Sequence, residues 1–364
     1  MQYTRKDLGA YKLHFIKTTS YKTITVKIHL REKALKDNIT KRSFLNSMLF
    51  LSSKDYPSKR EMTLKQQDLY AANITHGLRR LGNYFDTSIT LKVLNDKYTE
   101  EGNFKASLSF LSAILFRPKV KDCAFYKEEF DIVYERKKAN IESLSDDKAR
   151  YAAVRLMDEI DKDSPVSIRG AGYLEDLNSI TLENLYEYYE AMMRHDLVDI
   201  FVLGDVSVDE TEKMIKELFP FDTFKKENDD IQVDVTPNKK TNYIEEISDA
   251  KQSQLALALN LKDLTDYERK YPLTLYNIIL GGGDNSYLFK EVREKSSLAY
   301  YIGSVPNKCD DLILIRSGVT PGMEKKALDL IEKEIKNLKK GNFTNEDIVK
   351  AKEYFTTALD DMLE

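Results

Sequence analysis

Arg293 and Tyr300 are the two side chains of this sequence best suited to chemistry on a carbonyl group. A guanidinium carries a permanent charge on a fork of N–H donors and a phenol offers an O–H donor, so both stabilise an oxygen that gains negative charge. We expect Arg293 in the last turn of a helix over 286–295 and Tyr300 at the start of the next strand. A tight turn would then bring the two side chains to one site. The alternative is structural, with Arg293 paired to a neighbour such as Glu294 and Tyr300 half-buried.

A second group of polar side chains lies on a helix predicted over 38–52. The apolar residues of this helix recur at helical spacing, so one face is built to be buried. Its middle carries three small, uncharged side chains, those of Ser43, Asn46 and Ser47. Serine hydroxyls stay protonated near neutral pH and an amide has no useful basicity, so these residues are poor metal ligands and poor bases.

Composition and charge exclude several classes of protein. The chain has 364 residues, 42% of them hydrophobic and 32% charged, with a net charge of −4, so two domains are expected and a nucleic-acid partner is not indicated. Two cysteines, far apart, exclude a disulfide framework and a cysteine zinc site, and favour a reducing, cytoplasmic location. No segment is long and apolar enough to predict a membrane span. The four histidines lie in four separate elements.

The predicted elements follow the same order in two halves of the chain, which indicates a duplicated fold. In the first half we expect strands in 12–30 and 72–94, a strand over 196–204, and helices over 38–52, 61–72, 102–116, 122–144, 147–161, from Thr181, and 208–219, the last opened by Ser207 and Glu210. In the second half we expect strands near 242–248, 253–261, 298–305 and 310–318, and helices over 267–280, 286–295, 323–339 and 345–362.

These elements predict an α+β protein of two homologous α/β-roll domains, each a sheet flanked by helices. The first domain covers 1–221, a linker rich in charge, Asn and Pro covers 222–241, and the second domain covers 242–364. The second domain lacks a counterpart of the portion from Thr181 to Pro220. We therefore expect either a truncated C-terminus or a naturally short chain.

The stretch "LGGGDNSYLFKEVREKSSLAYYIGS", residues 280–304, resembles the C-terminal signature of the pitrilysin and mitochondrial-processing-peptidase family of zinc peptidases. "TKRSFLNSMLFLSSKDYPS" is similar to the helix that carries the metal in that family, in which the pattern is His-Phe-Leu-Glu-His. The resemblance is strongest to non-catalytic bacterial members made alongside a catalytic sister. It implies that Arg293 and Tyr300 complete an active site by contacting the substrate backbone and the developing oxyanion. It also implies that Gly281, Gly282 and Gly283 contact substrate, although a flexible turn explains them equally well.

On this pattern the first metal histidine falls at Ser43, the general-base glutamate at Asn46 and the second histidine at Ser47. Zinc needs imidazoles and a carboxylate, so we expect no metal and no cofactor in this chain, with zinc only in the partner. Glu135 or Glu142 could be the relic of the distal metal carboxylate, or both are ordinary surface residues.

The sequence therefore predicts a metal-free, non-catalytic subunit of a heterodimeric zinc peptidase. The sister subunit would carry His-x-x-Glu-His, and the substrate would be an extended peptide or an unfolded protein bound at sheet edges. Two alternatives stay open: an inert structural scaffold, and a stand-alone peptide-binding module. Neither the partner nor the substrate is named by the sequence.

Overall fold

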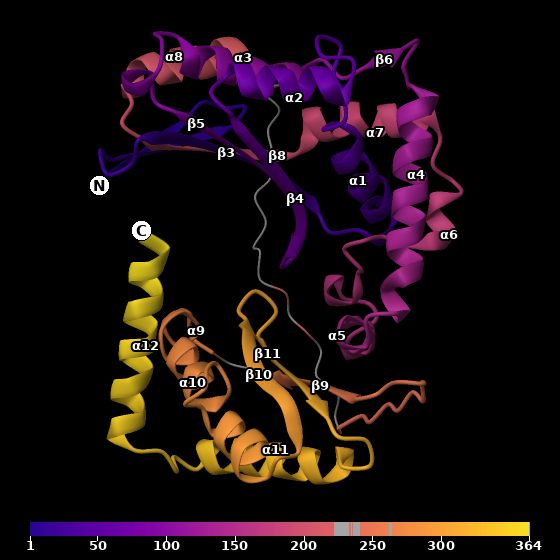
Figure 1. The fold of residues 1–364 in the computed structure, drawn as a ribbon, viewed down its shortest axis with the longest axis vertical. Helices are drawn as coiled ribbons and strands as arrows, with labels where there is room; N and C mark the ends of the chain where they lie inside the picture. Colours follow the sequence, from indigo (N-terminus) through magenta and orange to yellow (C-terminus); the bar gives the residue numbers. More distant parts are fainter. Residues whose placement is uncertain (222–232, 234, 236–240, 262–263, 364) are drawn as a thin grey trace. The chain divides into compact units, whose positions relative to one another are not determined.

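The computed structural model describes residues 1–221, 233, 235, 241–261 and 264–363. The chain divides into two compact units (Figure 1). Unit 1 comprises Met1–Glu142 and Ile168–Ile231, and unit 2 comprises Ser143–Ser167 and Gln232–Glu364. The predicted linker over 222–241 lies almost wholly outside the described residues. No helix among the described residues is both long and apolar enough to cross a membrane.

Unit 1 is built on a six-stranded sheet with the order β1-β2-β8-β3-β5-β4. All neighbouring strands are antiparallel except β2 and β8, which are parallel. The strands are β1 (Gln2–Asp7), β2 (Lys12–Lys17), β3 (Thr23–Lys33), β4 (Asn73–Leu81), β5 (Tyr84–Leu94) and β8 (Leu197–Gly204). The sequence predicted five of these strands and missed β1, which pairs with β2. Strand β4 lies at an edge of the sheet.

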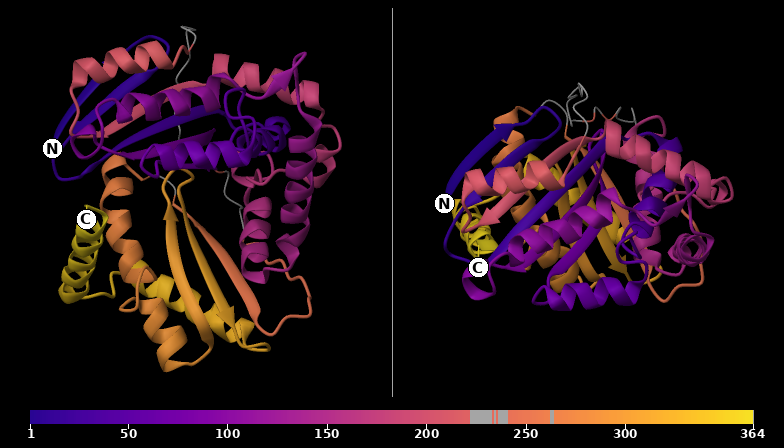
Figure 2. Two further views of the ribbon diagram at one scale, coloured as in Figure 1. Left: turned by 45° about the horizontal axis from the view of Figure 1, so that its top comes forward. Right: turned by 90° about the horizontal axis from the view of Figure 1, so that it is seen from above.

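Strand β3 shows why the sheet of unit 1 has one covered face. Ile24, Val26, Ile28 and Leu30 are buried, and the residues between them are partly exposed. This alternation is typical of an antiparallel sheet that packs on one side only. The covered face lies under α2 (Lys59–Asp68), α3 (Asn103–Phe116) and α8 (Val208–Leu218), as Figures 1 and 2 show.

The other helices of unit 1 gather around one end of the sheet (Figure 1). They are α1 (Lys36–Met48), α4 (Lys127–Glu142), α6 (Leu174–Leu177) and α7 (Leu182–His195). Thr181 and Asn184 form a capping box at the start of α7. The capping box predicted for Ser207 and Glu210 is wrong, because the Ser207 side chain caps no backbone N–H at the start of α8.

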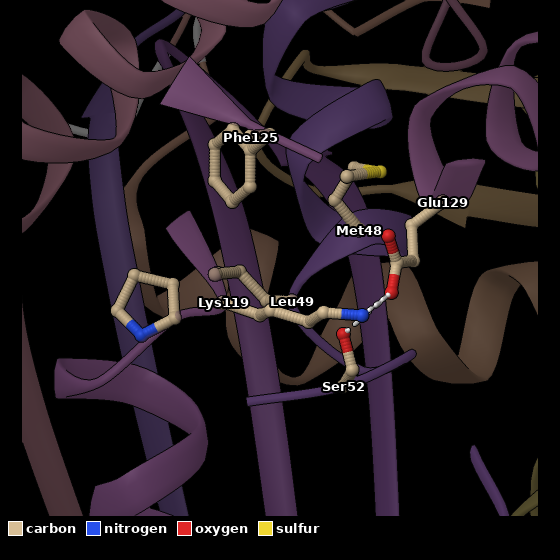
Figure 3. A pocket seen from close by; sticks show the side chains of 7 residues that line it. Met48, Leu49, Ser52, Lys119, Phe125 and Glu129 are labelled. Atoms are coloured by element: carbon tan, nitrogen blue, oxygen red, sulfur yellow. Dashed lines mark hydrogen bonds and ion pairs between the residues drawn. The ribbon is translucent and has the colours of Figure 1, made fainter. Parts of the chain in front are cut away.

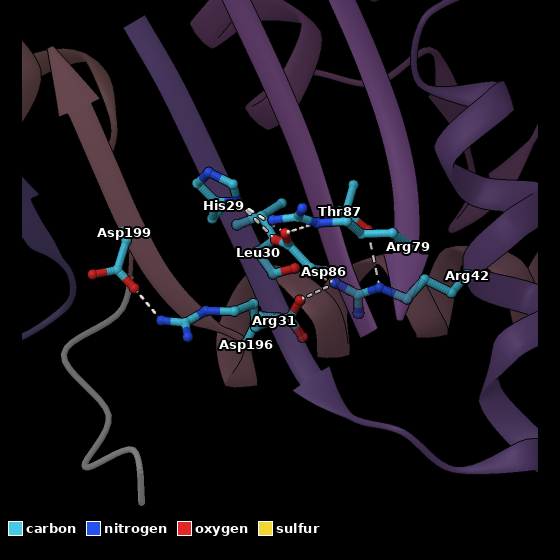
Figure 4. A network of polar contacts seen from close by, with 9 residues as sticks. All are labelled: His29, Leu30, Arg31, Arg42, Arg79, Asp86, Thr87, Asp196 and Asp199. Carbon is cyan, nitrogen blue, oxygen red and sulfur yellow. Dashed lines mark hydrogen bonds and ion pairs between the residues drawn. The ribbon is translucent and has the colours of Figure 1, made fainter. Parts of the chain in front are cut away.

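Arg42 on α1 joins three elements of unit 1 through a fully buried guanidinium (Figure 4). Its Nη2 lies 2.6 Å from Asp196 Oδ2 and donates to the Leu30 carbonyl at 2.7 Å. Its Nε donates to Thr87 Oγ1 at 2.9 Å. A charge of this kind is tolerated inside a protein only when it is paired and hydrogen-bonded. The network therefore fixes α1 against the sheet.

Unit 2 contains a three-stranded antiparallel sheet with the order β10-β11-β9. The strands are β9 (Ser253–Asn260), β10 (Ala299–Asn307) and β11 (Leu312–Val319), and the helices around them are α9 (Asp266–Lys270), α10 (Pro272–Leu280), α11 (Glu324–Lys339) and α12 (Asn345–Leu363). The strand predicted over 242–248 is absent, since 241–250 has no regular secondary structure. The helix predicted over 267–280 is broken before Pro272 into α9 and α10.

Helix α5 (Lys148–Ile160) belongs to unit 2, although the sequence placed it in the first domain. Strand β11 is apolar on both faces, because Ile313 and Ile315 join one core while Leu312 and Leu314 join another. Helices α10 and α11 supply the first core, and Met157 and Ile160 of α5 contribute to the second. A sheet buried on both faces needs helices on both sides, and the segment 143–167 provides the missing layer.

The short elements complete the description. They are η1 (Asp96–Tyr98), β6 (Val120–Lys121), β7 (Ala124–Phe125), η2 (Ser143–Ser145), η3 (Pro165–Ser167) and the π-helix η4 (Phe289–Lys295). The division of the chain at 142/143, 167/168 and 231/232 means that the polypeptide passes between the two units three times rather than once.

Replacing Arg42 by Met should lower the free energy of unfolding by about 3–5 kcal/mol, because Asp196 is left buried without its counter-charge. Chemical denaturation followed by circular dichroism measures the change. Arg60→Met, at an exposed position of α2, is the matched control and should stay within about 0.5 kcal/mol of the parent. Equal stability of the Arg42 variant and the control would contradict the role given to this network.

Candidate functional site

Helix α1 faces α4 at the positions where the sequence pattern predicted a lost metal site. Ser43 is buried, with 4% of its surface exposed. Its hydroxyl oxygen accepts a hydrogen bond of 2.7 Å from Lys137 Nζ on α4. A lysine ammonium thus lies against the first of the three small polar residues.

Asn46 and Ser47 also form hydrogen bonds. His76 on β4 donates from Nδ1 to Asn46 Oδ1 at 3.2 Å, and its ring stacks on Phe50 with the centroids 4.1 Å apart. Ser47 Oγ donates to the Ser43 carbonyl at 3.4 Å. These residues are one turn apart on α1, so their side chains share one side of the helix.

The electrostatics of this group oppose a second cation. Burial lowers the pKa of Lys137 from 10.5 to about 8. The pKa of His76 is lowered as well, first by burial and then by the charges of Lys59 and Lys137. Both pKa shifts indicate a partly dry environment beside α1, and the shift of His76 also reports the positive charges of Lys59 and Lys137.

The residues present do not fit a zinc ion. A zinc site needs imidazole nitrogens, thiolates or carboxylates, whereas α1 offers two hydroxyls and one amide, and α4 adds an ammonium bonded to one of those hydroxyls. Within the described residues, no group of three or more His, Cys, Asp or Glu side chains could hold a metal ion. Glu135 and Glu142 are both exposed, and no hydrogen bond joins Glu135 to α1 in the described part of the chain. Lys137, which the sequence did not single out, places an ammonium rather than a carboxylate beside Ser43.

A small pocket lies next to the end of α1 (Figure 3). Its volume is about 10 Å³, which is room for about one water molecule. Lys119 pairs with Glu129 across it, and Ser52 donates to the same carboxylate at 3.4 Å. The pocket is therefore too small for a substrate, and the Lys119–Glu129 ion pair crosses it.

Arg293 lies in unit 2, within the π-helix η4 rather than in the α-helix predicted over 286–295. π-Helical turns are rare and frequently occur at functional sites. The guanidinium carbon is 4.7 Å from the centre of the Phe289 ring, and the residue is exposed. No ion pair joins Arg293 to Glu294 among the described residues, so the structural alternative for Arg293 is not realised.

Tyr300 occupies a β-bulge at the start of β10. Ala299 pairs with Val319 and Tyr301 pairs with Gly318, which leaves Tyr300 without a partner on β11. A bulge re-aims a side chain out of the regular ladder, and bulges are over-represented next to active sites. Tyr300 is 57% exposed, so it is not half-buried as the structural alternative required.

A tight turn joins the two elements, as predicted. Ser297 has a φ of +51°, in the left-handed region, and its N–H bonds to the Arg293 carbonyl at 3.1 Å. The N–H of Leu298 reaches back to the Val292 carbonyl at 3.1 Å and ends the helix. Because only three residues separate the end of η4 from the start of β10, Arg293 and Tyr300 lie on adjoining ends of two packed elements.

The three glycines play different parts. Gly281 is buried, and a Cβ there would lie 2.7 Å from Ser304 Oγ, so the close approach of this loop to β10 requires glycine. Gly282 and Gly283 are partly exposed, and Tyr354 of α12 lies over Gly283. A pocket of about 180 Å³ opens beside Gly283, between the loop and α12.

Residues 179–355 match the family model "Peptidase M16 inactive domain". Over these residues the chain is similar to the inactive domains of the M16 peptidase family. The M16 match runs from α7 to α12 and includes Arg293 and Tyr300. The resemblance found in the sequence is therefore confirmed.

Individual proteins are also similar to this chain in sequence or in structure. A Bacillus subtilis protein named "Probable inactive metalloprotease YmfF" is 28% identical over 350 residues, 94% of this chain and 81% of the relative. A second B. subtilis protein, "Uncharacterized zinc protease YmxG", is 27% identical over 192 residues, 52% of this chain and 45% of the relative. The crystal structure of a conserved protein from Enterococcus faecalis superposes with a TM-score of 0.92 at 28% identity, over 99% of this chain and 85% of that one. A peptidase M16 inactive domain from Pseudomonas fluorescens shares the fold, with a TM-score of 0.81 at 18% identity over 98% and 84% of the two chains.

Replacing Lys137 by Met should stabilise the protein near pH 7 by about 2 kcal/mol, because burial penalises the ammonium in the folded state. The folded pKa of about 8 lies below the 10.5 of an unperturbed lysine, so the penalty is complete below pH 8 and disappears as the pH approaches 10.5. The stability gain should therefore shrink between pH 8 and pH 10. Denaturant titrations at several pH values measure it, with Lys138→Met on the same helix as control. A gain that is absent at pH 7, or that grows with pH, would contradict the assignment.

Proposed function

We propose that this chain is the metal-free, non-catalytic subunit of a heterodimeric zinc peptidase. The chain is a homologue of inactive M16 peptidases. A sister subunit with a His-x-x-Glu-His helix would hold zinc and supply the general base. This chain would supply Arg293 and Tyr300 to the sister's active site and would need no cofactor of its own. The complex would be cytoplasmic.

The observation that carries this proposal is the condition of Arg293 and Tyr300. Both are exposed, and each lies at a local irregularity of the backbone, a π-helix and a β-bulge. The Arg293 guanidinium lies over the Phe289 ring, and among the described residues it forms no ion pair and the Tyr300 hydroxyl forms no hydrogen bond. Charged forks and phenols of this kind are the donors that stabilise an oxyanion. An inert scaffold has no need to keep them unengaged.

The substrate we propose is an extended peptide or an unfolded segment. Strand β4 in unit 1 and strand β10 in unit 2 are sheet edges, whose unpaired backbone groups can bind another strand. Main-chain hydrogen bonds tolerate many sequences, which suits a processing peptidase. Gly282 and Gly283, partly exposed near β10, are the glycines of the loop left for contact with peptide.

In a complex reconstituted with its catalytic sister, Arg293→Ala should lower peptide turnover about 100-fold, since one oxyanion donor is worth about 3 kcal/mol. Tyr300→Phe, which removes only the hydroxyl, should reduce turnover in the same direction. Steady-state kinetics on a quenched fluorescent peptide measures both effects, and size-exclusion chromatography reports assembly.

Arg316→Ala is the matched control, because Arg316 is an exposed arginine of the same unit, on β11. Its complex should retain the parental rate. Unchanged turnover for Arg293→Ala in a fully assembled complex would favour the scaffold function instead. Peptide cleavage by the isolated chain, abolished by a chelator, would also contradict the proposal.

A further inference from the structure

The degenerate metal position is surrounded by positive charge rather than left neutral. Lys137 of α4 donates to Ser43, and Lys59, the first residue of α2, is near enough to lower the pKa of His76 together with Lys137. No ion pair joins Lys59 or Lys137 to a carboxylate in the described part of the chain. Lys119, beside the end of α1, shows the usual arrangement, since it is paired with Glu129.

The donors and acceptors at this position are unbalanced. The ammonium of Lys137 has three N–H donors, and among the described residues only one of them is used, by Ser43. Asn46 uses its amide oxygen to accept from His76, which leaves the NH₂ of Asn46 as a further donor. A partly buried site rich in donors and without an acidic partner fits a ligand that only accepts hydrogen bonds and carries negative charge. A carboxylate is the group of a peptide that does both.

The site also lies beside a place where a peptide can bind. His76 belongs to β4, the edge strand of the sheet in unit 1, and α1 packs against that strand. A peptide paired with the free edge of β4 would direct alternate side chains to the two faces of the sheet. One of these side chains could then approach the turn of α1 that carries Ser43 and Asn46.

We propose that the position vacated by the metal is a carboxylate-binding site in which Lys137 is the counter-charge and Asn46 the second donor. This inference rests on the peptide binding of the proposed function and names its specificity, namely peptides with an acidic residue opposite α1. The carboxylate has two possible sources, an Asp or Glu side chain and a peptide C-terminus. Metal-bearing relatives would attract an electron-rich oxygen to a cation at this position, and here a lysine provides the cation.

Isothermal titration of the full chain with three peptides separates the sources of the carboxylate. The first is a blocked, extended peptide with a central Glu, the second has Gln in its place, and the third is the Gln peptide with a free C-terminus. We expect the Glu peptide to bind at least tenfold more tightly than the blocked Gln peptide, the gain of one charge-assisted hydrogen bond. Tighter binding of the third peptide alone would assign the site to C-termini.

Variants test the residue. Lys137→Met should remove the preference for Glu, and Lys137→Glu should reverse it in favour of a Lys peptide, an effect that a purely structural lysine would not produce. Lys138→Met should leave the preference unchanged. Equal affinities of all three peptides for the parent protein would overturn the inference while leaving peptide binding intact.

A second measurement keeps the two proposals distinguishable. Acetylation of Lys137 by a limiting amount of an amine-reactive acetylating reagent can be quantified by mass spectrometry. It should be slowed by the blocked amino acid N-acetylglutamate amide and not by N-acetylglutamine amide. If no peptide binds but this protection is seen, the carboxylate site stands and the peptide-binding part of the proposed function fails. Absence of protection together with equal peptide affinities overturns the carboxylate site alone.

Discussion

The hydrogen bond between Lys137 Nζ and Ser43 Oγ is the contact on which this account of the protein depends. It joins α4 to α1 at the position where the sequence resemblance predicts a lost metal site, and it places a positive charge where a divalent cation would have to bind. Serine and asparagine are neutral, so these side chains alone would not repel a metal ion. The ammonium of Lys137 does repel it, because its positive charge and its volume both exclude the ion. The packing of α1 against α4 therefore opposes a metal ion at this position.

In unit 2 the candidate residues Arg293 and Tyr300 are exposed rather than bonded to a neighbouring helix. The π-helix η4 and the bulge at Tyr300 are departures from regular structure, and such departures persist where they serve a purpose. A tight turn of three residues, Ser296 to Leu298, connects them. The sheet that carries Tyr300 is covered on its second face by α5, which comes from the segment 143–167 between two parts of unit 1. This segment accounts for two of the three passages of the chain between the units.

Much of the fold could be predicted because its signals are local. The alternation in β3 and the apolar run of β11 specify strands within a few residues, and the Thr344–Asp347 pair that opens α12 is a capping box visible in the sequence. The missed features are long-range. Strand β1 has a weak pattern and is defined by its pairing with β2, and the partner of α5 is a sheet about 100 residues further along the chain. The segment 242–248 has the apolar spacing of a strand but pairs with no strand in the described part of the chain.

The same distinction applies to the site. The family resemblance led to Ser43, Asn46 and Ser47, and their side-chain chemistry predicted that they are poor metal ligands. Lys137 could not, because a lysine in the stretch "ERKKAN" reads as a solvated helix surface until α4 is seen to pack on α1. Its signal is electrostatic and exists only in three dimensions.

Anomalous scattering at the zinc edge from crystals of this chain soaked in zinc tests the central claim most directly. The account predicts no anomalous peak between α1 and α4, and an ordered Lys137 side chain in contact with Ser43. A zinc peak within coordinating distance of Ser43 or Ser47, with Lys137 displaced, would contradict it.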